Sequence, residues 1–146
     1  MAIEYSLFLA SAGGAAGVRR VVAASAPEVD WDAERVTAYR SPTGLRVTVM
    51  DRTWSDRVVE TPTVQVGFRL DKFADPDPQY DEVVRLTVAI LAADPGDAVL
   101  QQDHEICWLL RRGDSWIAHS GGSLWSAHRL SLLPVVPQRR PMPYPD

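Results

Sequence analysis

The segment from Pro78 to Ala93 constrains the fold most, because it combines helix-forming signals with an unusually wide apolar face. Asp77 suits the N-cap and Pro78 the first helical position, while Asp94-Pro95-Gly96 ends the helix. At about 100° per residue, the polar and small side chains fall on one stripe and large apolar side chains cover the rest. That stripe holds Asp81, Glu82, Arg85, Ala89 and Ala92. So wide an apolar face needs a large surface to cover, most simply a β-sheet.

The segments around this helix supply the strands of such a sheet. Thr63 to Leu70 alternates apolar and polar residues, which predicts a strand buried on one face. Leu45 to Asp51 alternates in the same way, so the two strands are expected to pair as a hairpin through the long loop from Arg52 to Pro62. After the helix, Ala98 to Gln101 and Ile106 to Arg111 are short apolar runs around a polar turn, which predicts a second hairpin.

The remaining elements have weaker signals. Ile3 to Ala10 is rich in strand formers, and the apolar spacing that follows predicts a short helix from Ala15 to Ala24. The polar connection from Pro27 to Pro42 is expected to contribute an irregular edge strand. Trp116 to His119 predicts the last strand, and Leu124 to Leu133 is apolar without a clear period.

The expected order is therefore strand, helix, strand, strand, helix, strand, strand, strand. This order predicts an α+β fold, with a mostly antiparallel sheet and two helices packed on one face. Residues 1–133 are expected to form a single domain. Five of the last thirteen residues are prolines, so 134–146 is expected to be a tail that is extended or disordered and has no core of its own.

Composition narrows the function classes. The net charge of −4 argues against nonspecific binding to nucleic acid or to an anionic membrane. Apolar runs stay far below the roughly 18 residues of a membrane span, and Glu4 interrupts the N-terminal apolar run, so we expect a cytoplasmic protein. Cys107 is the single cysteine, which excludes an internal disulfide and predicts a buried thiol in an apolar strand. Nothing in the sequence indicates the oligomeric state.

Candidate catalytic and metal-binding groups are few. His104, His119 and His128 lack the short spacings of a zinc site, and neither glycine cluster continues into a phosphate loop. Asp103-His104-Glu105 offers acid and base groups on a turn, where solvated side chains are the simpler interpretation. We therefore expect no enzyme, no metal and no cofactor, and keep a hydrolase that uses His104 or His119 as a third hypothesis.

Two acidic clusters and two loop tryptophans are the candidates for a protein-binding surface. The first cluster comprises Asp71, Asp75, Asp77, Asp81 and Glu82, and the second comprises Glu28, Asp30, Asp32 and Glu34 around Trp31. Helix capping and solvated loops would also explain these carboxylates. Aromatic anchors ringed by charge are common binding hot spots, and Trp54 beside Asp51 and Asp56 fits that description best. The predicted binding residues are Trp54, Asp56, Asp75, Asp77 and Trp31.

Four strings of the sequence resemble a known family. They are MAIEYSLFLA at 1–10, VGFRLDKF at 66–73, DAVL at 97–100 and LLRRG at 109–113. On these strings and on its element order, the chain resembles the immunity proteins of the Sit (swarming inhibition) bacterial toxin and immunity systems, from Met1 to about Leu133. The resemblance is thin from Gly13 to Pro42, and Asp103-His104-Glu105 stands where family members carry Asn-Gly-Glu.

The resemblance implies a cytoplasmic immunity protein of bacterial competition, which binds a cognate toxin stoichiometrically and neutralises it without catalysis. It identifies no functional residues. The acidic clusters would suit a basic toxin surface, such as that of a nuclease. The alternative function is a small-molecule-binding or regulatory α+β domain with a pocket between sheet and helices.

Overall fold

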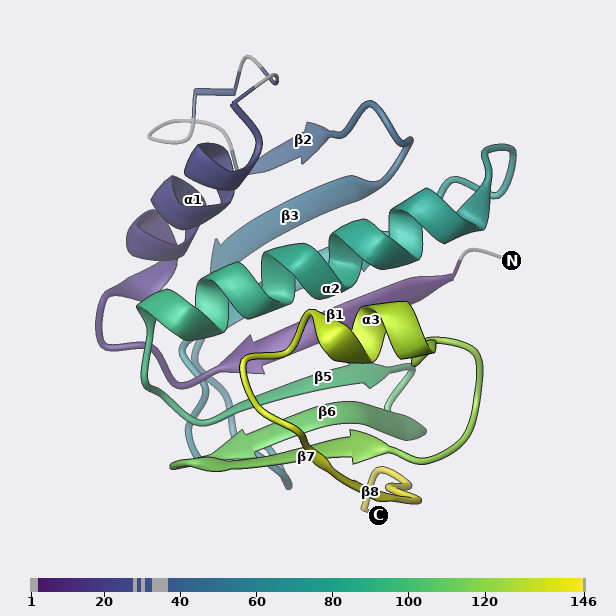
Figure 1. Ribbon diagram of the computed structural model, residues 1–146. Helices are drawn as coiled ribbons and strands as arrows, with labels where there is room; N and C mark the ends of the chain where they lie inside the picture. The colour runs from purple at the N-terminus through teal and green to yellow at the C-terminus, as the bar shows by residue number, and fades with distance from the viewer. Residues whose placement is uncertain (1–2, 28, 30, 33–36, 146) are drawn as a thin grey trace.

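The computed structural model describes residues 3–27, 29, 31–32 and 37–145 (Figure 1). Its strands are β1 (Glu4–Leu9), β2 (Ala38–Arg40), β3 (Arg46–Asp51), β4 (Val64–Arg69), β5 (Ala98–Gln102), β6 (Ile106–Arg112), β7 (Ser115–His119) and β8 (Gln138–Arg140). Its helices are α1 (Gly14–Ser25), α2 (Pro76–Ala93) and α3 (Ala127–Ser131).

The described residues form one eight-stranded sheet, with the strand order β2-β3-β4-β1-β5-β6-β7-β8. Neighbouring strands are antiparallel, except that β8 runs parallel to β7. The helices lie together on one face of the sheet (Figure 1). The predicted α+β fold, its mostly antiparallel sheet and both hairpins are confirmed, and the edge strand expected between Pro27 and Pro42 is β2.

Two helix predictions need correction. Helix α2 begins at Pro76, and its N-cap is Asp75, whose carboxylate accepts the N–H of Asp77 at 3.1 Å. Pro76 and Pro78 both fit this first turn, because N–H groups there have no partner within the helix. The irregular apolar stretch from Leu124 to Leu133 contains α3, which was not predicted and which Ser126 caps by accepting the N–H of Arg129.

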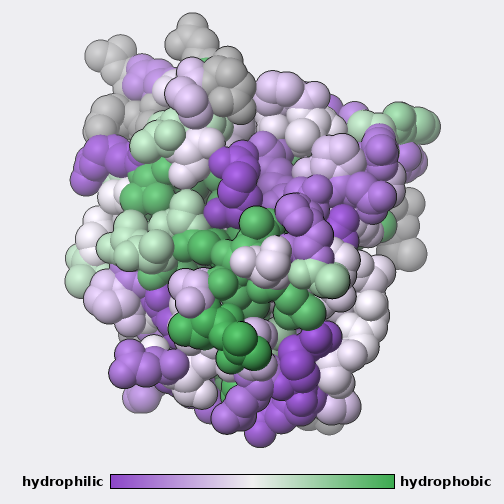
Figure 2. Space-filling view, in the orientation of Figure 1, coloured by the Kyte–Doolittle hydropathy of each residue, from purple (hydrophilic) through white to green (hydrophobic). Residues whose placement is uncertain are grey.

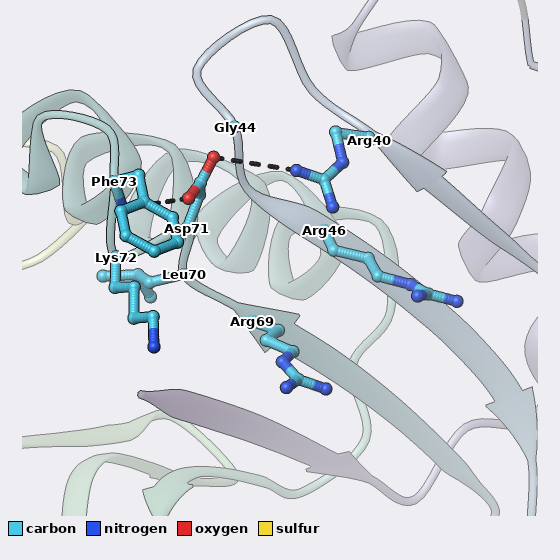
Figure 3. A pocket seen from close by; sticks show the side chains of 8 residues that line it. All are labelled: Arg40, Gly44, Arg46, Arg69, Leu70, Asp71, Lys72 and Phe73. Atoms are coloured by element: carbon cyan, nitrogen blue, oxygen red, sulfur yellow. Dashed lines mark hydrogen bonds and ion pairs between the residues drawn. The ribbon is translucent and has the colours of Figure 1, made fainter. Parts of the chain in front are cut away.

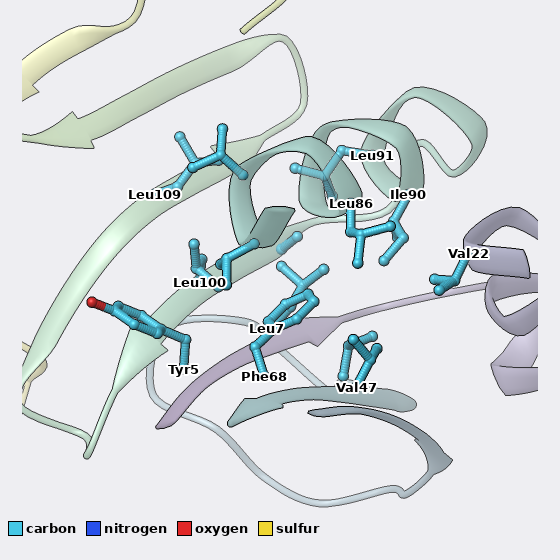
Figure 4. Close-up of a cluster of buried hydrophobic side chains, with 14 of the residues drawn as sticks. Tyr5, Leu7, Val22, Val47, Phe68, Leu86, Ile90, Leu91, Leu100 and Leu109 are labelled. Carbon is cyan, nitrogen blue, oxygen red and sulfur yellow. The ribbon is translucent and has the colours of Figure 1, made fainter. Parts of the chain in front are cut away.

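The main core lies between the sheet and the helices (Figure 4). Alternate residues of β1, β3 and β4 point to this side, where they meet the apolar faces of α1 and α2. Fully buried members include Leu7, Phe68, Leu86, Ile90 and Leu100. These side chains fill the space in which the alternative function would require a pocket.

A second cluster covers part of the opposite face. Phe8, Val99 and Ile117 point to this side of the sheet and pack with Val58 and Val59 of the loop after β3 and with Met142 and Tyr144 of the tail. The tail pairs with β7 and adds two buried side chains to this cluster.

The hydroxyl of Tyr144 ties the tail to this loop by donating to the carboxylate of Asp56. Replacing Tyr144 with Phe keeps the ring and removes only this bond, so we expect the free energy of unfolding to fall by about 1–2 kcal/mol. Urea unfolding would measure the change. Val136→Ala is the matched control, since Val136 belongs to the same tail and is 97% exposed. Equal urea midpoints for Tyr144→Phe and the wild type would show that this hydrogen bond does not stabilise the fold.

The surface over the helices has an apolar centre. Figure 2 shows hydrophobic residues gathered around α2 and the segment that joins α3 to β8, where Val135 and Val136 are exposed. In the part of the chain that the structure describes, no helix combines the length and apolar character needed to span a membrane.

Candidate functional site

Trp54 lies on the sheet face opposite the helices, in the loop that joins β3 to β4. The Trp54 ring packs edge-on against Phe8, with 4.9 Å between ring centroids. The Arg52 guanidinium lies over the Trp54 ring, 5.1 Å from its centroid. A surface hollow of about 500 Å³ lies beside it. The hollow is lined by Trp54, Ser55, Asp56, Arg57, His104, Tyr144 and Pro145.

Asp56 organises this loop from within. Its carboxylate accepts the N–H groups of Val58 and Val59 at 2.8 and 2.9 Å, and the hydroxyl of Tyr144. Burial and the bond to Asp56 raise the pKa of Tyr144. These three bonds explain the conformation of Asp56 without a partner protein.

The other predicted binding residues lie elsewhere. Asp75 caps α2 on the helical side of the sheet, and the exposed carboxylate of Asp77 pairs with Arg129 at 3.4 Å. Trp31 is partly buried, and its ring lies 4.7 Å from that of Tyr39. Its acidic neighbours Glu28, Asp30 and Glu34 lie outside the described residues. The structure therefore brings Trp54 and Asp56 together, and Asp75 and Asp77 together, but the sheet separates the two pairs.

The polar stripe of α2 is partly internal. Glu82 is buried, and its carboxylate accepts the hydroxyls of Ser41 and Thr43, each at 2.7 Å. Asp81 accepts from the guanidinium of the buried Arg129 at 2.8 Å. These carboxylates fasten α2 to the turn after β2 and to α3.

The two histidines of the hydrolase hypothesis both contact the tail. The His104 ring lies 5.1 Å from that of Tyr144, and Nδ1 of His119 accepts the N–H of Met142 at 3.0 Å. Each therefore has a packing role that explains its position. Among the described residues, no three His, Cys, Asp or Glu side chains gather in a way that would hold a metal ion.

The thiol of Cys107 is buried in the second cluster, and burial, assisted by the nearby Asp56 carboxylate, raises its pKa from 9.0 to about 11. Well below pH 9 the thiol is neutral in both folded and unfolded chains, so its contribution to stability is constant there. Between pH 9 and 11 only the unfolded chain ionises, and we expect stability to fall by up to about 1.4 kcal/mol per pH unit.

Urea midpoints of the wild type and Cys107→Ala, measured from pH 8 to 10, test this expectation. The raised pKa values of Tyr5 and Tyr144 should lower the stability of both proteins at higher pH. The difference between wild type and variant should therefore narrow as the pH passes 9. A constant difference would show that the thiol ionises equally in both states.

A basic cluster on the open sheet face was not predicted (Figure 3). Arg40, Arg46 and Arg69 lie in one row across β2, β3 and β4, each directly opposite the next. They border a hollow of about 610 Å³. Its lining residues are Arg40, Gly44, Arg46, Arg69, Leu70, Asp71, Lys72 and Phe73. The alternation of β3 and β4 had placed Arg46 and Arg69 on the polar side, but only the strand register brings them together.

Fold and surface together define an α+β protein with charged and aromatic surfaces suited to contact with another protein. The comparison of its sequence with protein families gives the assignment. The SitI3-like family model matches residues 3–129, so the chain belongs to this SitI-type immunity protein family. No curated protein and no solved structure matches the chain closely enough to add to that assignment.

Proposed function

We propose that the chain is a cytoplasmic immunity protein that binds a cognate bacterial toxin and neutralises it stoichiometrically, without catalysis. The observation that carries this proposal is the family match over residues 3–129. The packing roles of His104 and His119 also agree with a binding protein, because His104 packs on Tyr144 and His119 accepts the N–H of Met142.

Co-expression with the protein encoded immediately upstream tests the proposal. If that protein is the toxin, it should arrest growth of the host when expressed alone. The present chain should restore growth, and the two proteins should co-purify. A harmless neighbour that does not bind would move the small-molecule-binding hypothesis to first place.

Titration of the purified proteins separates binding from catalysis. A stoichiometric inhibitor should abolish toxin activity at an equimolar ratio and leave a proportional remainder below it. An enzyme that modifies the toxin would abolish the activity at a small molar fraction, given time. Progressive loss of activity at one part in a hundred would therefore contradict the proposed mode of action.

The predicted toxin-binding residues remain part of the proposal. Trp54 is the most informative of them, because Asp56 is needed to hold its own loop and Asp75 to cap α2. Trp54→Ala should weaken the complex if this surface is used. The expectation of a basic, nuclease-like toxin rests on the acidic clusters alone.

The alternative small-molecule function has less support. Large side chains such as Leu7, Phe68 and Leu100 occupy the space between sheet and helices (Figure 4). A thermal-shift screen against metabolites would test the alternative directly. A ligand that stabilises the chain in the absence of any protein partner would favour it.

A further inference from the structure

The sheet face opposite the helices is covered over only part of its width. The loop after β3 and the tail cover Phe8, Val99 and Ile117 on β1, β5 and β7. On β3 and β4 the same face is exposed at Arg46, Met50 and Arg69. This open part carries two successive rows of residues, an arginine row and a row of small residues.

The first row carries more positive charge than folding explains. Arg46 lies directly between Arg40 and Arg69, on strands about 4.8 Å apart, and like charges in directly opposite positions destabilise a sheet. Asp71 pairs with Arg40 at 3.7 Å, and Glu4 lies opposite Arg69 at the far end of the row. Arg46, at the centre, lies opposite an arginine on each side. This local excess of positive charge occurs on a chain whose net charge is −4.

The second row consists of small residues. Its members, each directly opposite the next, are Ala38, Thr48, Gly67 and Ser6. A Cβ at Gly67 would lie 3.6 Å from Glu4 Oε1 and 3.8 Å from Thr48 Cβ, which is ordinary contact, so neighbouring atoms do not require glycine here. Glycine inside a strand weakens it and often marks close approach by another backbone. The side chains of this row of small residues therefore project little beside the arginine row.

Phe73 stands beside the same row, 89% exposed, on a turn that is firmly held. The Asp71 carboxylate accepts the N–H of Phe73 at 3.0 Å. The buried amide of Gln79 accepts the N–H of Asp71 at 2.7 Å and donates to its carbonyl at 3.0 Å. Because the turn is already ordered, an aromatic contact made by Phe73 would require little additional ordering on binding.

We infer that the arginine row, the row of small residues beside it and Phe73 receive an acidic segment of the cognate toxin. This inference rests on the proposed function. The planar fork of arginine matches carboxylates, and carboxylates three or four residues apart on a helix repeat at about 5–6 Å, close to the spacing of the row. A nucleic acid fits less well, because Asp71 lies among the cations and the net charge of −4 opposes a polyanion.

Binding kinetics of the purified chain with the toxin encoded beside it test this surface. Arg46→Glu and Arg69→Glu should each slow association about tenfold or more at low salt, because exposed charges act mainly on the rate of encounter. The urea midpoint of Arg46→Glu should stay equal to wild type or rise, since its carboxylate faces an arginine on each side. That of Arg69→Glu should stay near wild type, since its carboxylate faces Arg46 on one side and Glu4 on the other. Phe73→Ala should speed dissociation without changing the midpoint.

Arg140→Glu is the matched control, because it makes the same charge change at an exposed arginine of β8 and should leave association unchanged. A wild-type complex whose rate is unaffected by Arg46→Glu and Arg69→Glu would overturn the inference and leave the proposed function standing. If the wild type neither binds the toxin nor rescues growth, the function and the inference fail together. If the wild type bound a short DNA duplex tightly and these variants abolished that binding, the ligand of this surface would be nucleic acid and not the toxin.

Discussion

Gly96→Ala is expected to lower the free energy of unfolding by about 3 kcal/mol or more, at the upper end of the effect of overpacking. A Cβ at Gly96 would lie 1.9 Å from the carbonyl oxygen of Ala10 and 2.8 Å from its carbonyl carbon. These are backbone atoms, so no rotamer change relieves the clash. The chain would have to separate the end of β1 from the approach to β5.

Hydrogen bonds on both sides of Gly96 oppose that separation. The N–H of Ala10 donates to the carbonyl of Asp97 at 2.9 Å, and the N–H of Gly96 donates to the Asp94 carboxylate at 2.9 Å. The hydroxyl of Ser11 donates to the same carboxylate at 2.5 Å. Relief of the clash at Gly96 would therefore weaken bonds at three neighbouring positions.

Urea unfolding followed by far-UV circular dichroism measures the Gly96→Ala effect. Gly13→Ala is the control, because a Cβ at Gly13 meets no atom within 4 Å, and its effect should stay within about 0.5 kcal/mol. If both alanine variants matched the wild type, the close approach between Gly96 and Ala10 would be absent in solution.

The sequence predicted the elements whose signals are local. The alternation in β4 and the Asp94-Pro95-Gly96 stop after α2 are complete within a few residues, so those boundaries were found. The start of α2 was placed two residues late, because Asp75-Pro76 and Asp77-Pro78 offer the same cap-and-proline signal twice. Helix α3 was missed because five residues are too few to show a helical period.

Features that depend on distant contacts could not be predicted. The periodicity of α2 places Glu82 on the polar stripe and contains no sign of Ser41 and Thr43, which bury it. The arginine row requires the register of three strands, and a shift of one residue would send Arg46 to the other face.

The turn after β5 has an unusual backbone conformation. Asp103 and His104 both have positive φ, at 54° and 55°, a pair of conformations that favours Asn-Gly. His104 accepts this strain in a position where its ring packs on Phe8 and Tyr144. The turn is thus linked to the tail, which lies beyond residues 3–129 that the family model matches.

Arg111 fastens the junction between the end of α2 and the start of β5, where Gly96 lies. It is buried, and its guanidinium donates to three carbonyls, those of Leu91, Asp94 and Gly96, where α2 ends. Burial lowers the pKa of this guanidinium, while the nearby Asp94 and Asp97 act in the opposite direction. A cation here also faces the negative end of the helix dipole. One side chain of β6 thus satisfies carbonyls that α2 and its connection to β5 leave without partners.

Arg111→Met should therefore lower the free energy of unfolding by about 3–5 kcal/mol, because it leaves several buried carbonyls without donors at similar side-chain volume. Arg111→Lys should recover less than half of the loss, since one ammonium lacks the planar fork that spans three acceptors. Arg112→Ala is the control in the same strand. Its exposed side chain makes one bond, to the carbonyl of Val58 at 2.7 Å, so its removal should cost about 1 kcal/mol. Equal urea midpoints for Arg111→Met and Arg112→Ala would mean that the three carbonyls find water instead, and that the junction is open to solvent.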